Sequence, residues 1–151
     1  MIAYYSWSGN TETLANTIQE KTGGDLVRIE PEDSYPDSYD ELVERAIHDQ
    51  RNMENLQIVQ NVEHMEDYDI VFIGYPIWFD TAPAVVQVFL DTYDFSGKTV
   101  LPFCTHMGSG IDGSMEAIRS HCPGAIVEDG FDETGDDSIY EWLQSHDLLN
   151  K

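Results

Sequence analysis

The sequence predicts an α/β fold in which helices cover both faces of a five-stranded parallel sheet, a doubly wound arrangement. Strand-like runs alternate with helix-like runs along the chain, a pattern typical of parallel sheets with crossover helices. The run Ile-Val-Phe-Ile at residues 70–73 is apolar throughout, as expected of a strand covered on both faces. Hydrophobic residues make up 41% of the 151 residues, which is enough for one core.

The strands are expected at residues 1–5, 25–30, 69–74, 98–104 and, as a short run, 124–128. The helices are expected at residues 10–21, 39–52, 82–91, 114–121 and 137–148. Apolar residues recur at helical spacing in four of these segments, namely Leu14, Ala15 and Ile18; Leu42, Val43, Ala46 and Ile47; Val85, Val86, Phe89 and Leu90; and Ile139, Trp142 and Leu143. Because no repeat, linker or low-complexity tract separates them, residues 1–151 are expected to form a single domain.

Acidic residues dominate the charge, with 29 Asp plus Glu against 7 Lys plus Arg and a formal net charge of -22. Nucleic acids and anionic membranes are therefore poor partners. The acidity either serves solubility alone or steers the protein toward basic partners. No apolar run approaches the roughly 20 residues of a membrane span. The first residues enter a strand without a basic region or cleavage site, so we expect a cytoplasmic protein.

The two cysteines are expected to be structural. Cys104 ends an apolar run, which favours a buried thiol. No C-x-x-C pair is present, so neither a dithiol nor a zinc site is expected.

Ligands of such folds bind beyond the carboxyl ends of the strands, where the strand order reverses. The first loop there contains Ser6, Trp7, Ser8, Gly9, Asn10 and Thr11. Its hydroxyls, its glycine and the helix start that follows favour binding of a phosphate, and the alternative is a plain helix cap. No Lys follows the glycine and G-x-G-x-x-G is absent, which excludes a Walker loop and a dinucleotide fingerprint. None of the seven basic residues lies in a candidate site loop, so a single monoester held by neutral donors is expected.

The loop after the third strand carries Pro76, Ile77, Trp78 and Phe79. An indole ring offers a flat apolar wall for a flat heterocycle. The alternative is that one of the two aromatic rings only covers the core. Because the first and third strands should be neighbours, this wall would lie beside the phosphate loop.

The loop after the fourth strand is rich in glycine and serine, and its candidate ligand-binding residues are Thr105, His106, Gly108, Ser109 and Gly110. Glycines leave backbone N–H groups accessible, so this loop could bind the edge of the heterocycle. It could also be a long turn, and the histidine could be incidental.

These loops resemble those of the flavodoxins, specifically the small bacterial flavodoxin-like group, and the likeness covers nearly the whole chain. Residues 6–11 are similar to the family's phosphate loop, (T/S)-x-(T/S)-G-N-T, and residues 76–79 to the P-I-W-aromatic loop whose Trp packs on flavin. The Tyr-Pro at 35–36, Tyr39, Glu41 and the Arg-Ala at 45–46 resemble the pattern around the second helix. The glycine-rich loop from Thr105 resembles the third flavin loop.

The resemblance implies the flavodoxin-like strand order 2-1-3-4-5 and non-covalent binding of FMN by the loop residues named above. It also implies a low-potential carrier of single electrons, a monomer or weak dimer, that docks on basic-surfaced reductases and electron acceptors. The chain departs from the family pattern twice. His106 and Met107 stand where many flavodoxins stack a Tyr on the outer flavin face, and Phe79 and Asp80 follow Trp78 where many have Gly beside flavin N5.

Other functions remain open at this stage. An FMN-dependent NAD(P)H quinone or nitro-compound reductase would need a nicotinamide site, and no basic residue is placed to bind a 2′-phosphate, although an oligomer could build a second pocket. A receiver domain would need an acidic cluster, but the first and third strands end in Tyr5 and Gly74. A low-molecular-weight phosphatase would need C-x5-R near the first strand, which is missing. The sequence therefore favours an electron-transfer protein over a self-sufficient enzyme.

Overall fold

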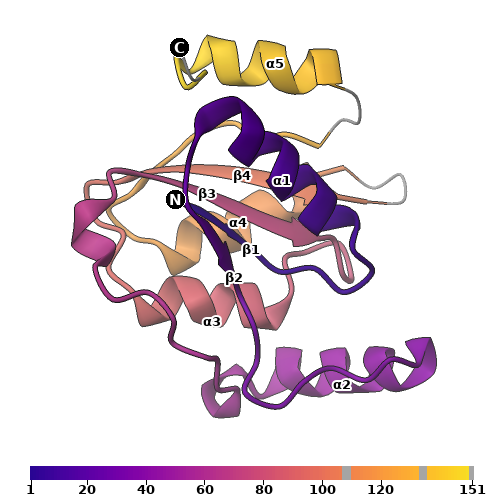
Figure 1. Cartoon of the computed structure of the whole chain (residues 1–151). Helices are drawn as coiled ribbons and strands as arrows, with labels where there is room; N and C mark the ends of the chain where they lie inside the picture. The colour runs from indigo at the N-terminus through magenta and orange to yellow at the C-terminus, as the bar shows by residue number, and fades with distance from the viewer. Residues whose placement is uncertain (107–109, 133–135, 150–151) are drawn as a thin grey trace.

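The computed structural model describes residues 1–106, 110–132 and 136–149. Within these ranges five parallel strands form one sheet (Figure 1): β1 (Ile2–Tyr4), β2 (Leu26–Arg28), β3 (Ile70–Pro76), β4 (Thr99–Thr105) and β5 (Ile126–Val127). The strands lie in the order β2-β1-β3-β4-β5. The predicted fold class and the strand order implied by the resemblance are confirmed.

Helices cover both faces of this sheet (Figure 1). On one face lie α1 (Asn10–Thr22) and α5 (Asp136–Ser145), and on the other lie α3 (Ala84–Thr92) and α4 (Asp112–His121). Crossover helices on both faces bury the central strands β1, β3 and β4, which is why these strands can be apolar.

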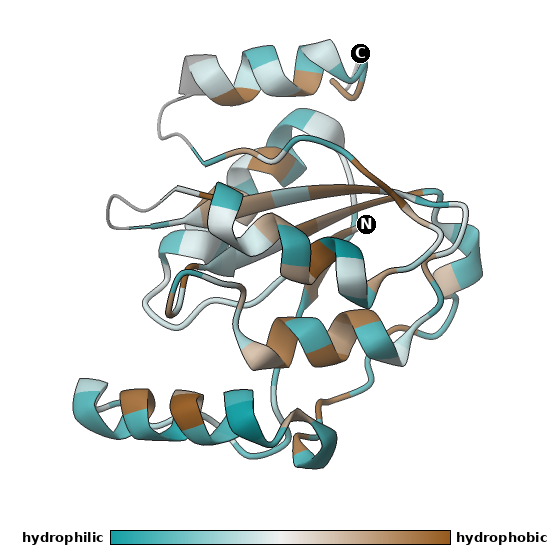
Figure 2. Ribbon diagram, turned by 180° about the vertical axis from the view of Figure 1, so that it is seen from behind, coloured by the Kyte–Doolittle hydropathy of each residue, from teal (hydrophilic) through white to brown (hydrophobic). Residues whose placement is uncertain are grey.

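The second helix, α2 (Tyr39–Arg51), is further from the sheet and packs against α3. Two short 3-10 helices that the sequence did not predict, η1 (Met53–Asn55) and η2 (Met65–Asp67), lie between α2 and β3. Figure 2 shows the central strands as mostly hydrophobic, whereas α2 and α5 alternate hydrophobic and hydrophilic residues along their length. Such alternation is typical of helices that bury one face only.

Successive side chains of the strands enter two different cores, as the two-residue period of a strand requires. In β1, Ala3 belongs to the core beneath α3 and α4, whereas Ile2 and Tyr4 belong to the core beneath α1 and α5. Both cores are closely packed around the sheet. In β3, a Cβ on Gly74 would lie 2.2 Å from Cζ of Phe103 in β4, so only glycine leaves room for that ring.

Element boundaries differ from the predicted ones by at most three residues. α3 begins at Ala84 because Pro83 occupies the position before it, where a missing N–H is tolerated. β3 and β4 extend to Pro76 and Thr105, beyond the predicted ends at 74 and 104. α5 ends at Ser145, three residues early.

Candidate functional site

The three loops singled out from the sequence meet at one edge of the sheet. They follow β1, β3 and β4, which are adjacent and parallel, so their carboxyl ends lie side by side. The hydroxyls of Thr11 and Thr105 are hydrogen-bonded at 2.8 Å and join the first loop to the third. The backbone N–H of Ile77 donates to the carbonyl oxygen of Thr105 at 3.0 Å and joins the second loop to the third.

The first loop is a tight turn that leads into α1. Gly9 precedes the helix with φ of +97°, a left-handed conformation that favours glycine. Its N–H donates to Oγ of Ser6 at 3.1 Å, and its carbonyl oxygen accepts from both the N–H and the hydroxyl of Thr13 at 3.0 Å. These bonds hold the loop in shape before any ligand binds.

The loop presents a set of neutral donors. Ser6 and Thr11 are buried, while Ser8 and Asn10 are exposed. Among the described residues, nothing accepts a hydrogen bond from the hydroxyl of Ser8 or from the backbone N–H groups of Asn10, Thr11 and Glu12. Unpaired N–H groups at the first turn of a helix attract anions, because the helix dipole adds to their partial charge. The donor set therefore fits a phosphate group.

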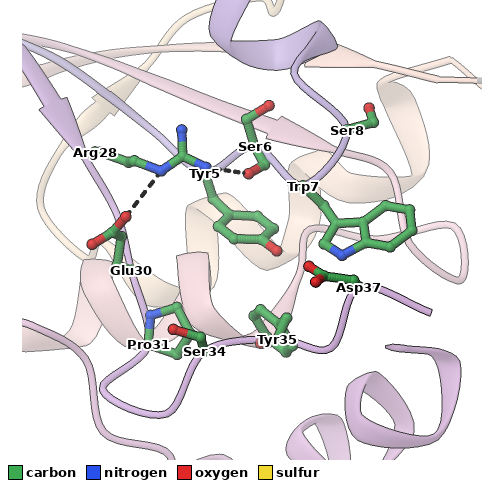
Figure 3. Close-up of a pocket in the computed structure, with 10 residues that line it drawn as sticks. All are labelled: Tyr5, Ser6, Trp7, Ser8, Arg28, Glu30, Pro31, Ser34, Tyr35 and Asp37. Atoms are coloured by element: carbon green, nitrogen blue, oxygen red, sulfur yellow. Dashed lines mark hydrogen bonds and ion pairs between the residues drawn. The ribbon is translucent and has the colours of Figure 1, made fainter. Parts of the chain in front are cut away.

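One charged residue that the sequence did not place in the site reaches this loop. Arg28, at the end of β2, donates from Nη2 to the carbonyl oxygen of Ser6 at 2.6 Å (Figure 3). It also pairs through Nη1 with Glu12 at 2.6 Å. Its Nε lies 3.1 Å from Glu30. Arg28 adds a charged residue beside the loop, but it belongs to β2 and not to the loop, so the binding of a phosphate by neutral donors stays a prediction. The strand order could have indicated that Arg28 lies near the loop, because β2 is adjacent to β1 and the two strands end together.

The second loop holds Trp78 in an aromatic cluster. Trp78 is half-buried, and its ring meets the rings of Tyr5 and Tyr35 edge to face, at centroid distances of 5.4 and 5.5 Å. The guanidinium of Arg45, on α2, lies 4.8 Å from the ring centroid of Tyr35. Burial raises the pKa of Tyr5 and of Tyr35, so both are neutral at physiological pH. The sequence did not identify either tyrosine as a support of Trp78.

The two residues after Trp78 adopt a backbone conformation that is unusual for their type. Phe79 and Asp80 have φ of +54° and +60°, and backbone bonds of 3.0 and 3.1 Å join Trp78 to Thr81 in both directions. This is the geometry of a two-residue turn with left-handed central residues, which normally contains Gly or Asn. Phe79 is 56% exposed. It does not cover the core, so that alternative is wrong for this ring.

The side chain of Trp7 contacts the segment between β2 and α2. Its Nε1–H donates to the carbonyl oxygen of Pro36 at 2.9 Å. That segment and the first loop enclose a cavity of about 390 Å³ (Figure 3), with Trp7, Tyr5, Arg28 and Tyr35 among its lining residues.

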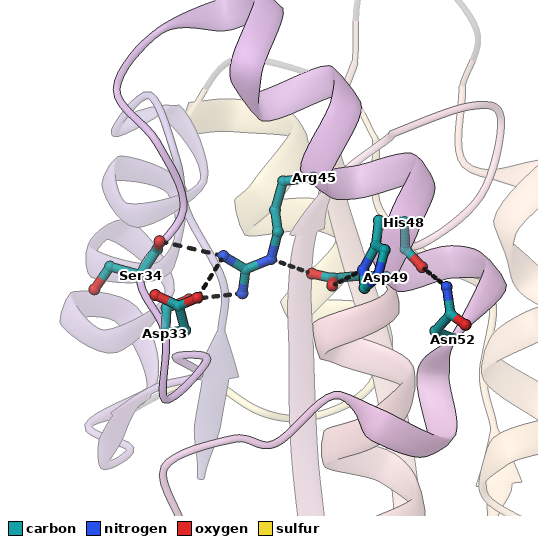
Figure 4. Close-up of polar contacts among 6 residues, drawn as sticks. All are labelled: Asp33, Ser34, Arg45, His48, Asp49 and Asn52. Atoms are coloured by element: carbon teal, nitrogen blue, oxygen red, sulfur yellow. Dashed lines mark hydrogen bonds and ion pairs between the residues drawn. The ribbon is translucent and has the colours of Figure 1, made fainter.

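Arg45, a residue of α2, holds the segment between β2 and α2 in place. It donates to the carbonyl oxygen of Asp33 at 2.7 Å and pairs with Asp49 at 3.0 Å (Figure 4).

The third loop is described in part. Gly108 and Ser109, which were predicted to bind a ligand, lie outside the described residues, as does Met107. His106 is exposed, and its Nε2 is 3.0 Å from the carbonyl oxygen of Asp132. Gly110 has φ of +77°. The next N–H, of Ile111, donates to the carboxylate of Asp132 at 2.8 Å, so the end of the loop is anchored to the segment before α5.

Both cysteines are buried, as predicted for Cys104. Burial raises the pKa of Cys104 to about 12 and that of Cys122 to about 11. The reactive thiolate is therefore scarce at neutral pH, and both thiols act as core side chains. In the part of the chain that is described, no helix combines the length and the apolar character needed to cross a membrane.

Several solved structures share this architecture. A protein of Bacteroides eggerthii, provisionally classed as a flavoprotein, is 31% identical with a TM-score of 0.85, and the match covers 95% of this chain and 94% of that one. A second such protein, from Bacteroides uniformis, is 25% identical with a TM-score of 0.84 over 95% and 96% of the two chains. A flavoprotein of Lactobacillus acidophilus, solved in complex with FMN, is 22% identical with a TM-score of 0.73 over 93% and 95%.

The fold also occurs in an NADH:FMN oxidoreductase, at 16% identity and a TM-score of 0.56. No match to the chain was found among the curated proteins. A family model described as flavodoxin matches residues 1–146. That match spans the sheet, all three loops and the helices on both faces, and the chain therefore belongs to the flavodoxin family.

Proposed function

We propose that the protein binds one FMN without a covalent link and serves as a low-potential carrier of single electrons between redox enzymes. The observation that carries this proposal is the position of the donor loop beside Trp78. The N–H groups of Asn10, Thr11 and Glu12, which have no acceptor among the described residues, lie at the same sheet edge as the indole. A phosphate on the former and a flat ring against the latter are the two ends of FMN.

The cofactor and the protein have separate roles in this proposal. Bound FMN would supply reversible one-electron chemistry, and the protein supplies binding, orientation and electrostatics. The first loop holds the phosphate, Trp78 presents a wall that excludes water, and the backbone of the third loop is left to contact the ring edge. Net charge of -22 opposes further negative charge on the ligand, which lowers the potential at which the flavin is fully reduced.

The same charge supports docking on basic-surfaced reductases and electron acceptors. Attraction between opposite surface charges speeds association, and salt screens it over about 10 Å at 0.1 M ionic strength. We infer that the association rate with such partners falls steeply as salt is added.

The competing function is that of an FMN-dependent NAD(P)H quinone or nitro-compound reductase, and it has the support of the fold shared with an NADH:FMN oxidoreductase. Within the described part of the three loops no Lys or Arg is present, and the neighbouring Arg28 is paired with Glu12 and Glu30. A nicotinamide dinucleotide therefore has little positive charge to bind.

Two measurements on the FMN-loaded protein decide between these functions. An anaerobic redox titration should show that the second, more negative one-electron potential of bound FMN lies below that of free FMN. The shift is about 59 mV for each tenfold by which addition of the second electron weakens binding of the cofactor. When the protein is mixed with NADH or NADPH and a quinone, its turnover number should stay below roughly 1 per second, the lower end of the range typical of enzymes. Faster turnover, or a potential at or above that of free FMN, would favour the reductase.

A further inference from the structure

Arg28 connects both ends of the phosphate loop to the neighbouring strand. One guanidinium bonds the carbonyl oxygen of Ser6, where the loop begins, and the carboxylate of Glu12, in the first turn of the helix that follows. The third contact, to Glu30, fixes the guanidinium on the far side. A planar fork with five N–H donors can make such contacts at once, whereas an ammonium group cannot match this geometry.

The contact with Ser6 also sets the direction of a donor in the loop. In a trans peptide the C=O and the following N–H point to opposite sides, and no cis peptide occurs in the described chain. With the Ser6 carbonyl drawn toward Arg28, the N–H of Trp7 is directed away from it. No described residue accepts a hydrogen bond from that N–H, so it is available to a ligand on the side opposite Arg28.

Net attraction between Arg28 and a phosphate does not account for this arrangement. Its single positive charge is outnumbered by the two negative charges of Glu12 and Glu30, whose carboxylate oxygens lie 2.6 and 3.1 Å from the guanidinium. Its side chain is 37% exposed, so water and salt screen the guanidinium further. What remains is geometry, because the guanidinium holds the start of the loop and the first turn of α1 at a fixed separation.

We propose that Arg28 is a positioning residue for the phosphate group of the cofactor: through the Ser6 carbonyl and Glu12 it holds the donors of residues 6–12 in the arrangement that binds a phosphate monoester. The proposal rests on the proposed binding of FMN at this loop. It assigns the preference for FMN over riboflavin, which lacks the phosphate, in part to a residue on β2 that does not touch the ligand.

The test titrates the apoprotein with FMN and with riboflavin, at low and at high salt, for the wild type and three variants. Arg28→Gln removes the fork, Arg28→Lys keeps the charge without it, and Arg119→Gln removes one exposed charge from the last turn of α4 as a control. We expect Arg28→Gln to weaken FMN about tenfold, the size of one charge-assisted hydrogen bond, and to leave riboflavin unchanged. Arg28→Lys should also lose FMN affinity, both losses should persist at high salt, and Arg119→Gln should match the wild type.

Each other outcome has one meaning. Equal losses of affinity for FMN and riboflavin would show a general structural role and overturn the proposal. The proposal would also be overturned if Arg28→Lys bound FMN as tightly as the wild type, or if the loss of FMN affinity disappeared at high salt. Thermal unfolding of each apoprotein separates misfolding from weakened binding. A wild type that binds neither flavin would instead refute the proposed function, so failures of the two proposals are distinguishable.

Discussion

The hydroxyls of Thr11 and Thr105 are hydrogen-bonded at 2.8 Å although 94 positions separate them in the chain. Thr11 belongs to the first turn of α1 and Thr105 is the last residue of β4, so this bond joins the phosphate loop to the glycine-rich loop. Thr11 is 1% exposed. A hydroxyl buried to that degree needs a partner, because an unsatisfied one costs free energy on folding.

We therefore expect Thr11→Val and Thr105→Val to lower the free energy of unfolding of the apoprotein by about 1 to 2 kcal/mol each, since each leaves the other hydroxyl unpaired. The double variant should lose clearly less than the sum. Urea unfolding of the four proteins gives the coupling energy. Thr17→Val is the matched control, because its hydroxyl bonds the carbonyl oxygen of Thr13 within α1. Strictly additive losses would mean that the two loops are not coupled through this bond.

Trp78 should act on the ring of the ligand and not on its phosphate. The Trp78→Ala variant is expected to weaken FMN and riboflavin by the same factor, roughly tenfold, because both contain the ring that would stack on the indole. Fluorescence titration of the apoprotein with both ligands measures this. Phe79→Ala is the neighbouring control and should have a smaller effect, since Phe79 is exposed and lacks the support that Tyr5 and Tyr35 give Trp78. A larger loss for FMN than for riboflavin would place the phosphate, and not the ring, against Trp78.

Gly74→Ala should destabilise the sheet by about 1 to 3 kcal/mol, the usual cost of overfilling a packed core. The added methyl group would lie 2.2 Å from Cζ of Phe103, a distance that requires the ring to move. Phe103→Leu in the same chain removes the clash. The double variant should therefore be more stable than the sum of the two single losses predicts. Thermal or urea unfolding decides this, and additive losses would show that the ring can move aside freely.

Alkaline pH should destabilise the protein through its buried thiols. Burial raises the pKa of Cys104 to about 12 and that of Cys122 to about 11, from an ordinary value of 9.0. The unfolded chain loses these protons at lower pH than the native protein. The free energy of unfolding should therefore fall as pH rises above about 9, by up to 1.4 kcal/mol per pH unit for each thiol.

The control for this prediction is the Cys104→Ala, Cys122→Ala double variant, whose decline between pH 9 and pH 11 should be shallower. Buried tyrosines titrate in both proteins and cancel in the comparison. Urea unfolding at several pH values provides the slopes, and equal slopes for the two proteins would contradict the assignment to the thiols.

Local pattern and family resemblance together were sufficient for the fold. The alternation of apolar runs indicated each strand and each α-helix. Only the exact ends of these elements and the two 3-10 helices were missed, and the start of α3, for example, is determined by Pro83. The three loops could be named in advance since ligand sites of parallel sheets follow the strand ends. Which of their residues bind FMN stays a prediction.

What the sequence did not indicate depends on contacts between distant segments. Arg28 reaches Ser6 only because β2 pairs with β1, and a strand residue gives no local sign of that contact. Tyr35 lies in a segment without regular structure, and only the fold brings its ring against Trp78. The left-handed backbone of Phe79 and Asp80 is unusual for Phe, and it accompanies backbone hydrogen bonds between Trp78 and Thr81 that close the turn.

Titration of the purified apoprotein with FMN, riboflavin and FAD, followed by flavin fluorescence, tests the central claim most directly. If the donor loop and Trp78 form one cofactor site, the protein binds one FMN per chain, binds riboflavin more weakly because it lacks the phosphate, and releases unmodified FMN on heating. A protein that binds no flavin, or binds riboflavin as tightly as FMN, would contradict the assignment of the phosphate to the loop between β1 and α1.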